Sequence, residues 1–466
     1  MRSSIFFLSS FFALSITISS CNKQTPRPNI ILMMADDLGY GDTGFNGSTE
    51  NQTPALDELA SQGIIFSRFY SASPVCSPTR ASCLTGRNPY RMNIPTANSG
   101  HMPESEITLA EILREHGYRT GHFGKWHLGI FTTNQKDANR GRPGNEQHLA
   151  VPTDHGFDSF FSTESKVPTW DPMIKPIQFD TTQGENLRFG WKALNETSDS
   201  VPYGTRYWTG LEEQYEGPLE GDDSGIIMDH AINFISKSLT DKSPFFSVIW
   251  FHAPHLPVVV DSSYRANYPD LPLRKQLYFG TISALDEQVG RLWDFLTLNE
   301  VANNTIIFFC SDNGPELRTP GSAGIFRGKK RDLYEGGIRV PAFCVWPDEL
   351  QKDIRIDAPA FTSDYLPTLV DFLNIDFPDD RLLDGTSIKP LLLGNQTTRA
   401  VPMGFRFQNK LSWVTDRYKL ISVDKGRSYE LYDLIQDPQE KNNIISENKE
   451  QANQLITELE AWLATF

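Results

Sequence analysis

Nearly unbroken runs of apolar residues recur along this chain and alternate with helical patterns. The sequence predicts buried strands at residues 29–35, 245–251 and 305–310, and a further strand at 64–70. It predicts helices from Pro54 toward Gln62, from Thr108 to Gly117, and from about Leu273 to Leu298. A strand without an alternating polar face is typical of a parallel sheet covered on both sides. The pattern therefore predicts an α/β fold, with a large, mostly parallel central sheet sandwiched by helices.

Local signals mark the ends of two of these helices. Thr53 followed by Pro54 is typical of a helix start, because proline in the first turn loses no hydrogen bond. Thr108 and Glu111 form a capping-box pattern, in which each side chain can accept a hydrogen bond from the other residue's backbone N–H. Gly117 is a suitable residue to end that second helix.

Two regions depart from this alternation. Residues 132–221 are rich in Asn, Gly, Pro, Asp and aromatic residues and show weak periodicity, which predicts long loops over the sheet. Beyond about Met403, strand patterns at 411–414, 418–423 and 429–432 precede a helical pattern at 448–463. They predict a small antiparallel sheet with one helix, packed on the main domain. We therefore expect a signal segment at 1–20, a main domain at 26–385 and a C-terminal subdomain at 386–466.

The first twenty residues are predicted to be an export signal and not part of the fold. Arg2 supplies a positive end, and residues 5–18 are mostly apolar but short for a membrane-spanning helix. The following Ile18-Ser19-Ser20-Cys21 resembles a bacterial lipoprotein cleavage box, in which Cys21 is lipidated. It predicts an exported protein, anchored through lipid alone in the bacterial cell envelope, in the periplasm or at the outer membrane. The alternative is an ordinary secretory signal with an incidental cysteine.

Composition narrows the classes of partner. The chain has 466 residues, with 43 Lys plus Arg against 58 Asp plus Glu, which gives a formal net charge of −15. Such a chain is a poor candidate for nonspecific nucleic-acid binding, although a local basic pocket could still hold an anionic substrate. Cys83, Cys310 and Cys344 show no metal-like spacing. Cys310 and Cys344 lie in apolar runs and are predicted to be buried, which does not suggest a disulfide framework.

Carboxylate and amide side chains follow two of the predicted strands. Asp36 and Asp37 end the first strand, and Asp312 and Asn313 follow the strand at 305–310. Because the carboxyl ends of parallel strands share one edge of a sheet, these side chains can converge there. Oxygen donors of this kind suit a hard divalent cation, Ca²⁺ or Mg²⁺, better than Zn²⁺. For either pair alone, helix capping or a solvated turn is the simpler explanation.

Basic and histidine side chains fall in three further segments beside Gly/Pro-marked loops. These segments are Gly124-Lys125-Trp126-His127, Phe251-His252-Ala253-Pro254-His255, and Arg327-Gly328-Lys329-Lys330. Each could be structural by itself. Gathered around a metal, they would form one compact positive pocket in an acidic protein, suited to a sulfate or phosphate ester.

The most specific motif begins at Cys76. Cys76-Ser77-Pro78-Thr79-Arg80 continues into Ala81-Ser82-Cys83-Leu84-Thr85-Gly86-Arg87. Two later segments add to this motif and to the segments above: Glu335-Gly336-Gly337-x-Arg339-Val340-Pro341 and Leu431-Tyr432-Asp433-Leu434. With all of them, the chain resembles the type I, formylglycine-dependent sulfatases of the alkaline-phosphatase superfamily. The likeness extends over nearly the whole chain after the signal, with order and spacing kept.

The resemblance implies a role for each matching residue. Asp36, Asp37, Asp312, Asn313 and the modified Cys76 would bind one Ca²⁺ ion. Arg80 would steady the formylglycine hydrate, His127 would assist its proton transfers, and Lys125, His252 and Lys330 would hold the sulfate. His252 would also protonate the leaving alcohol. Lys330 is preferred to Lys329 because it lies five residues before Glu335, the spacing of the family.

The chemistry explains why an aldehyde is needed at position 76. A hydrated aldehyde carries two hydroxyls on one carbon, so one can attack sulfur and the other can later expel sulfate by re-forming the aldehyde. Dependence on a separate formylglycine-generating maturase follows. An exported, lipid-anchored sulfatase suggests a substrate among sulfated polysaccharides or their oligosaccharides, either an algal glycan such as ulvan, carrageenan or fucoidan, or a glycosaminoglycan.

Two alternatives stay open from the sequence. One is a phosphodiesterase or phosphonate hydrolase of the same superfamily, and the other is a catalytically inactive, lipid-anchored glycan-binding protein. Side chains of the loop region could stack on sugar rings or pair with a uronate or a second sulfate; they are Trp170, Tyr203, Arg206, Tyr207 and Trp208. For each of them, packing within the loops is the simpler expectation.

Overall fold

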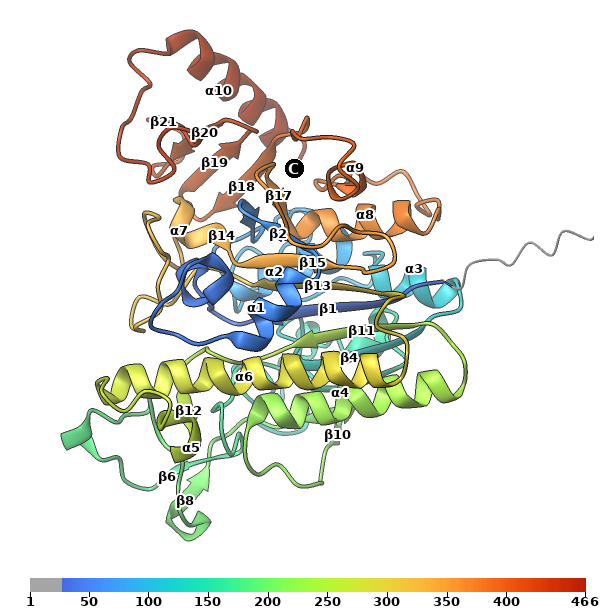
Figure 1. Ribbon diagram of the computed structural model, residues 1–466, viewed down its shortest axis with the longest axis vertical. Helices are drawn as coiled ribbons and strands as arrows, with labels where there is room; N and C mark the ends of the chain where they lie inside the picture. Colours follow the sequence, from blue (N-terminus) through green and yellow to red (C-terminus); the bar gives the residue numbers. More distant parts are fainter. Residues whose placement is uncertain (1–26) are drawn as a thin grey trace, which may run out of the picture.

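The computed structural model describes residues 27–466, and its central element is a mixed, ten-stranded sheet (Figure 1). In spatial order its strands are β10 (Glu213–Gln214), β9 (Trp208–Gly210), β5 (Ser159–Thr163), β4 (Arg119–Lys125), β11 (Phe245–Trp250), β1 (Asn29–Ala35), β13 (Thr305–Ser311), β15 (Ala342–Val345), β2 (Ile64–Phe66) and β16 (Ile354–Ile356). The run from β5 to β13 is parallel throughout, so its strands all end at one edge.

Helices cover both faces of this sheet. In residues 27–466 the helices are α1 (Pro54–Ser61), α2 (Cys76–Thr85), α3 (Leu109–Glu115), α4 (Asp223–Thr240), α5 (Ser262–Arg265), α6 (Leu273–Leu298), α7 (Glu335–Ile338), α8 (Tyr365–Phe372), α9 (Lys389–Leu392) and α10 (Lys449–Leu463), of which α10 packs on a separate C-terminal sheet. Figure 1 shows α4 and α6 side by side on one face. Side chains of α2, α3 and α8 belong to the apolar cluster on the other face.

The central strand β1 shows why the apolar run is unbroken. Ile30, Leu32 and Met34 pack into the cluster that includes α2 and α3, whereas Ile31 and Met33 pack into the cluster that includes α4 and α6. Successive side chains of a strand point to opposite faces, so burial on both faces requires an apolar residue at every position. The predicted α/β architecture is confirmed.

The helix starts predicted at Thr53-Pro54 and at Thr108 are confirmed. Thr108 accepts a hydrogen bond from the backbone of Glu111 at 3.2 Å, and the Glu111 carboxylate accepts one from the backbone of Thr108 at 2.8 Å, which completes the capping box of α3. α1 begins at Pro54 after Thr53. α6 has the predicted limits, Leu273–Leu298.

The strand predicted at 64–70 is instead two strands in different sheets. β2 belongs to the main sheet, and β3 (Phe69–Tyr70) lies between β14 (Arg339–Val340) and β17 (Ala360–Phe361) in a separate three-stranded sheet. The break falls at Ser67 and Arg68. The Arg68 guanidinium donates to the backbone carbonyls of Thr415 and Asp416, so the chain turns there toward the C-terminal region.

The region predicted as loops contains part of the main sheet. β5, β9 and β10 extend the sheet beyond β4, and the short pairs β6 (Ile174–Pro176) with β8 (Ser200–Pro202) and β7 (Gly190–Lys192) with β12 (Val258–Val260) brace the remaining loops. Because polar, irregular segments flank β5, the composition of the region gave no indication of a strand. Neither β4, with its Arg, Gly, His and Lys, nor α4 was predicted.

A four-stranded antiparallel sheet and α10 form the C-terminal part (Figure 1); a small antiparallel sheet with one helix was predicted, but its first strand, β18, was not. The strands are β18 (Met403–Phe407), β19 (Lys410–Val414), β20 (Tyr418–Ser422) and β21 (Glu430–Asp433). One face packs Leu420 and Leu431 against Leu455 and Leu459 of α10. The other face shares a core with the main domain through side chains such as Phe405.

The export signal and Cys21 lie outside the described residues. Within 27–466, no helix is both long and apolar enough to cross a membrane.

Candidate active site

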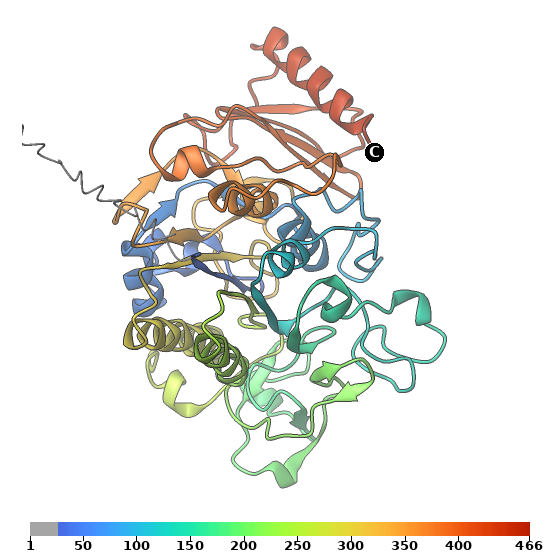
Figure 2. The same ribbon diagram turned by 90° about the vertical axis from the view of Figure 1, so that its right-hand side faces the viewer.

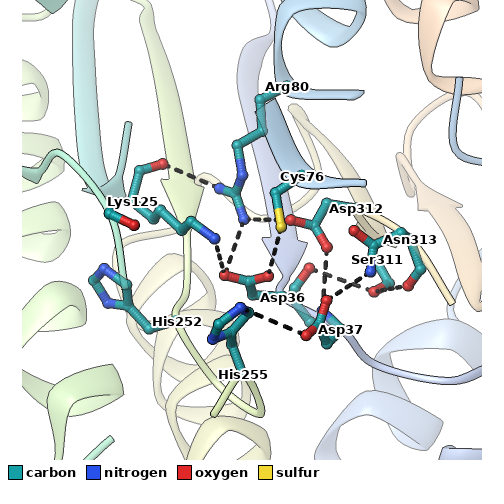
Figure 3. A network of polar contacts seen from close by, with 12 residues as sticks. Asp36, Asp37, Cys76, Arg80, Lys125, His252, His255, Ser311, Asp312 and Asn313 are labelled. Atoms are coloured by element: carbon teal, nitrogen blue, oxygen red, sulfur yellow. Dashed lines mark hydrogen bonds and ion pairs between the residues drawn. The ribbon is translucent and has the colours of Figure 1, made fainter. Parts of the chain in front are cut away.

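The carboxyl edge of the parallel strands gathers most of the predicted site (Figure 3). Asp36 and Asp37 follow β1, Lys125 ends β4, and Asp312 and Asn313 follow β13. β1 and β13 pair in register, with Ala35 opposite Ser311, so the residues just beyond their ends meet. The backbone N–H of Asp37 donates to Asp312 at 3.1 Å across this junction.

Cys76 and Arg80 enter from α2. Cys76 is the first residue of the helix and Arg80 lies one turn later, so both side chains project from one face. Pro78 is tolerated between them because the first backbone N–H groups of a helix have no partner within it. The Arg80 guanidinium donates to the Lys125 carbonyl at 3.0 Å and to Asp312 at 2.7 Å. The C-x-P-x-R spacing thus places a thiol and a cation against the same carboxylates.

Oxygen donors at the centre of the cluster fit a hard cation. The donor atoms of Asp36, Asp37, Cys76 and His255 all lie within 4.8 Å of one another. Two buried oxygens, Oδ2 of Asp37 and Oδ1 of Asn313, have no hydrogen-bond partner among the described residues. Such orphaned acceptors are costly unless a ligand satisfies them, and carboxylate and amide oxygens are the donors that Ca²⁺ and Mg²⁺ prefer.

Asp312 differs from Asp36 and Asp37 in its pKa, which is raised and not lowered. Its two oxygens accept hydrogen bonds from the Asp37 backbone and from Arg80. Burial and the charge of Asp36 raise the pKa of Asp312 to about 6. This crowding of negative charge is the condition that a bound cation relieves.

Charge compensation keeps the other carboxylates ionised. Burial alone would raise the pKa of Asp36, but the charges of Lys125, His255 and Arg80 hold it well below its usual range. The Lys125 ammonium lies 2.5 Å from Asp36. Burial together with Asp312 and Asp36 raises the pKa of the Cys76 thiol to about 12, so an unmodified Cys76 keeps its proton at neutral pH unless a cation binds beside it.

Lys330 and His127 complete the rim of the cluster. Lys330 reaches in from the loop after β13, where its ammonium pairs with Asp37 and lies 3.5 Å from the sulfur of Cys76. Burial lowers the pKa of His127 well below its usual value, and the nearby Lys125 adds to this effect. The Nε2 of His127 lies 3.4 Å from Asn98, and its buried Nδ1 has no partner within residues 27–466.

His252 is not part of this cluster, contrary to its predicted role. Its Nδ1 lies 2.7 Å from Asp223 of α4 and its Nε2 lies 2.7 Å from Thr163 of β5, so protein groups occupy both nitrogens. The ring is fully buried. Figure 3 shows it apart from the carboxylates. His252 therefore ties β11 to its neighbours and has no free nitrogen for an ester.

His255 takes the place that was predicted for His252. Its Nδ1 donates to the Leu256 carbonyl at 2.6 Å, which directs Nε2 toward Asp37, 3.6 Å away (Figure 3). Burial lowers the pKa of His255 to about 3, although Asp36 and Asp37 act in the opposite direction. The sequence contained both histidines in one short segment. Only the path of the loop after β11 decides which one faces the site.

The remaining sequence candidates pack as ordinary structure. Tyr207 and Trp208 are fully buried and donate to Asp223 at 2.6 Å and Asp137 at 2.9 Å, so neither can stack on a sugar. Cys310 and Cys344 are buried, and the free cysteines include both, as predicted. Arg206 donates to the Lys136 carbonyl, whereas Tyr203 and Trp170 stay partly exposed.

The cluster as a whole can bind an anionic ester beside a nucleophile. It places Lys125, Lys330 and Arg80 around Cys76, with unsatisfied oxygens for a cation at its base. Cations of this kind stabilise the negative charge that develops when a sulfuryl or phosphoryl group is transferred.

Comparison with known proteins finds two family models that match overlapping parts of the chain. The family model described as "Sulfatase" matches residues 28–375. A second model, "N-sulphoglucosamine sulphohydrolase, C-terminal", matches residues 321–465.

Curated relatives and solved structures agree with these matches. N-acetylgalactosamine-6-sulfatase of Canis lupus familiaris is 30% identical, with 84% of this chain and 71% of the relative covered. Arylsulfatase D of Homo sapiens is 28% identical, with 84% and 74% covered. The crystal structure of Ps i-CgsB superposes with a TM-score of 0.78 at 29% identity, covering 94% of this chain and 92% of the other.

Proposed function

The chain belongs to the sulfatase family and is a sulfuric ester hydrolase, and on that premise we propose that formylglycine made from Cys76 is its nucleophile. The position of Cys76 carries the proposal. Its sulfur lies 3.4 Å from Asp36 and 3.5 Å from Lys330, at the centre of the charged cluster. The buried thiol, with its raised pKa, would be a poor nucleophile by itself.

Calcium is the cation that we propose for the site. Asp36, Asp37, Asn313 and residue 76 would hold it, with Asp312 beside them, and the two orphaned oxygens support this assignment. When bound, the ion would supply positive charge that activates the hydroxyls of the modified residue 76. Ca²⁺ accepts the irregular set of oxygen donors found here more readily than Mg²⁺ does.

The other residues divide the work of binding and proton transfer. Lys125 and Lys330 would hold the sulfate oxygens, and Arg80 would hold residue 76 and Asp312 in place. His127, with its free Nδ1, would take the proton that must leave residue 76 before sulfate is expelled. His255, and not His252, would move a proton at the leaving oxygen, because its Nε2 faces the cluster. The net reaction converts ester and water into alcohol and hydrogen sulfate.

A sulfated polysaccharide or one of its oligosaccharides is the proposed substrate. The relatives support a carbohydrate ester, since their names include N-acetylgalactosamine-6-sulfatase and a complex of Ps i-CgsB with k-i-k-neocarrahexaose. A solved structure from Bacteroides thetaiotaomicron, 26% identical to this chain, is described in connection with the metabolism of multiple glycosaminoglycans. An exported, lipid-anchored enzyme that depends on a formylglycine-generating maturase completes the proposal, with Cys21 as the anchor.

Variants at residue 76 test the nucleophile directly. Peptide mass analysis of active enzyme should show the mass of formylglycine, and not cysteine, at position 76. Cys76→Ala and Cys76→Ser should both lose essentially all turnover of an aryl sulfate while remaining folded by circular dichroism. Serine can accept sulfuryl but has no second hydroxyl on the same carbon with which to release it. Turnover by Cys76→Ser near the wild-type rate would refute the proposed nucleophile.

A rival within the superfamily is distinguished by the group that is transferred, sulfuryl or phosphoryl. The structure of a phosphonate monoester hydrolase of Agrobacterium radiobacter superposes with a TM-score of 0.62 at 21% identity, which shows a shared fold alone. We expect kcat/KM on an aryl sulfate to exceed that on the matching aryl phosphate mono- and diesters. The opposite order would favour the phosphorus esters. An inactive glycan-binding protein would turn over none of them.

A further inference from the structure

A cavity that is open to solvent lies beside the active site. Its volume is about 360 Å³, at the lower end of the range of roughly 300–1,000 Å³ that is usual for small-molecule sites. Loops that follow β4, β5 and β13 form the cavity, together with segments near β6 to β8. Except for the loop after β13, these segments are the teal and green ribbons that lie on one side of the molecule in Figure 2. We call it the basic cavity; its lining includes Lys136, Lys166, Lys175, Arg188, Tyr203 and Arg318.

The charge of this cavity is one-sided. Five lining residues are Lys or Arg, and the lining contains no Asp or Glu. Of the five, only Arg318 has a carboxylate within ion-pair distance among residues 27–466, namely Glu316 at 3.4 Å. In a chain with a formal net charge of −15, such a concentration of unpaired positive charge is unexpected. Like charges repel, so the arrangement costs stability unless an anion binds there.

Contacts connect the basic cavity to the catalytic cluster. Asn139 in its wall donates to Ser165 at 2.9 Å and to Asn98 at 3.0 Å, and Asn98 also faces His127. Lys166 follows the end of β5 by three residues, at the same edge as Lys125. Burial lowers the pKa of Lys166, and the charges of Lys125 and Lys330 lower it further, as expected for neighbouring ammonium groups.

We propose that the basic cavity is a subsite for a second anionic group, a carboxylate or a sulfate ester, on the saccharide whose scissile sulfate occupies the cluster around Cys76. The inference rests on the proposed function and adds the substrate class: the preferred substrates are polyanionic saccharides. Lys166 and Arg188 are the residues that read this second charge, Arg188 through its planar fork and Lys166 as a point charge. Tyr203, half-buried in the wall, offers a ring face to the sugar that carries the charge.

Three matched disaccharides test the preference. Each carries the same scissile sulfate, and the neighbouring sugar is neutral, carboxylated or sulfated. We expect wild-type kcat/KM to be about tenfold or more higher for both charged compounds than for the neutral one, the contribution of roughly one charge-assisted hydrogen bond. The carboxylated and sulfated compounds distinguish the two sources of the charge. Equal kcat/KM for all three compounds would overturn the proposal.

Charge-removing variants assign the effect to the cavity. Lys166→Gln and Arg188→Gln should each lower kcat/KM for the charged disaccharides about tenfold, and should leave the neutral disaccharide and a small aryl sulfate within about twofold. Lys237→Gln is the matched control. That lysine is exposed near the C-terminal end of α4, and the nearby Asp241 pairs with Arg119 at the start of β4, on the edge opposite the site.

The aryl sulfate separates failure of this inference from failure of the proposed function. A wild-type enzyme with formylglycine at position 76 that does not hydrolyse the aryl sulfate would contradict the proposed function itself. An enzyme that hydrolyses it, but whose preference among the disaccharides is unchanged in Lys166→Gln and Arg188→Gln, would contradict only the role of the basic cavity. An equal loss on all substrates would also contradict it, because the residues would then act on the reaction centre.

Discussion

At the scale of single residues, two histidines three positions apart have opposite environments. His252 is held by Asp223 and Thr163 and is fully buried, whereas the Nε2 of His255 faces Asp37. Tyr207 already donates to one oxygen of Asp223, and leaving the other oxygen buried without a partner would be costly, so His252 contributes to stability by satisfying it. His255 has a nitrogen facing the charged cluster, and in the proposed function it moves a proton at the leaving oxygen. Substitution of the two residues should therefore produce different kinds of loss.

The dependence on the leaving group separates these roles. His255→Ala should lower kcat/KM on a sugar sulfate by about 100-fold or more, and much less on an activated aryl sulfate, because a good leaving group needs little protonation. Its stability should change little. His252→Ala should lower the free energy of unfolding by about 3 kcal/mol and reduce turnover of both substrates alike. Denaturant unfolding and a leaving-group series measure the two effects. A steeper leaving-group dependence in His252→Ala would return the proton-transfer role to that residue.

At the scale of elements, the pairing of β4 with β11 decides where Lys125 lies. Gly124 pairs with Trp250 and has a φ of +98°. A Cβ at Gly124 would lie 2.0 Å from the Trp250 carbonyl oxygen. The strand can pass Trp250 only with glycine at this position. This close pairing places Lys125, the next residue, beside Asp36.

Gly124→Ala should therefore damage both stability and activity. We expect a loss of roughly 4 kcal/mol in the free energy of unfolding and a large loss of kcat/KM, since a displacement of about 1 Å at a binding residue can cost about 100-fold. Gly184→Ala is the matched control, because Gly184 also has a positive φ of +84° but a methyl group added there would meet nothing within 4 Å. It should lose only about 1 kcal/mol. Equal losses in the two variants would show that backbone strain, and not the collision with Trp250, is responsible.

At the scale of the whole molecule, a buried ionic group joins the C-terminal sheet to the main domain. Lys419 of β20 lies 3.0 Å from Glu335 of α7 and 2.9 Å from Glu440, and all three are essentially inaccessible to solvent. Burial would raise the pKa of Glu335, but Lys419 and Arg339 hold it below its usual value. Burial raises the pKa of Glu440 to about 7. Glu335 thus has two cations beside it, Lys419 and Arg339, whereas Lys419 is the cation that pairs with Glu440.

This imbalance predicts a dependence of stability on pH. Because the folded-state pKa of Glu440 lies above its usual value of 4.5, the folded state binds more protons, and stability falls as pH rises from about 4.5 to 7. Glu440→Gln cannot ionise, so its free energy of unfolding relative to wild type should increase between pH 5 and pH 8. The increase should be at most about 3 kcal/mol, at about 1.4 kcal/mol per pKa unit.

Urea unfolding at both pH values measures this difference. Glu450→Gln, on the exposed start of α10, removes one negative charge without touching Lys419 and should show no such trend. A relative stability of Glu440→Gln that falls toward pH 8 would contradict the prediction, because it would mean that the Glu440 charge stabilises the fold.

The sequence by itself determined the architecture and named most of the residues that meet at the carboxyl edge of the sheet. Strands buried on both faces, such as β1 and β13, must be apolar at every position, and that local requirement is legible without a structure. The same holds for the cap of α3 and for the one-turn spacing of Cys76 and Arg80. β4 and β5 were missed because Arg, Gly, His and Lys interrupt the apolar pattern of β4, and β5 is short and lies between polar, irregular segments.

Only the tertiary structure decided which side chains share the site. His255 displaced His252 because the direction of a side chain depends on the loop that carries it and on the partners already occupying each nitrogen. The basic cavity, likewise, draws its lysines and arginines from segments separated by more than a hundred residues, such as Lys136 and Arg318. A sequence motif identifies residues that are close along the chain. Electrostatic potential and hydrogen-bond partners depend on positions in space, so they follow only from the folded structure.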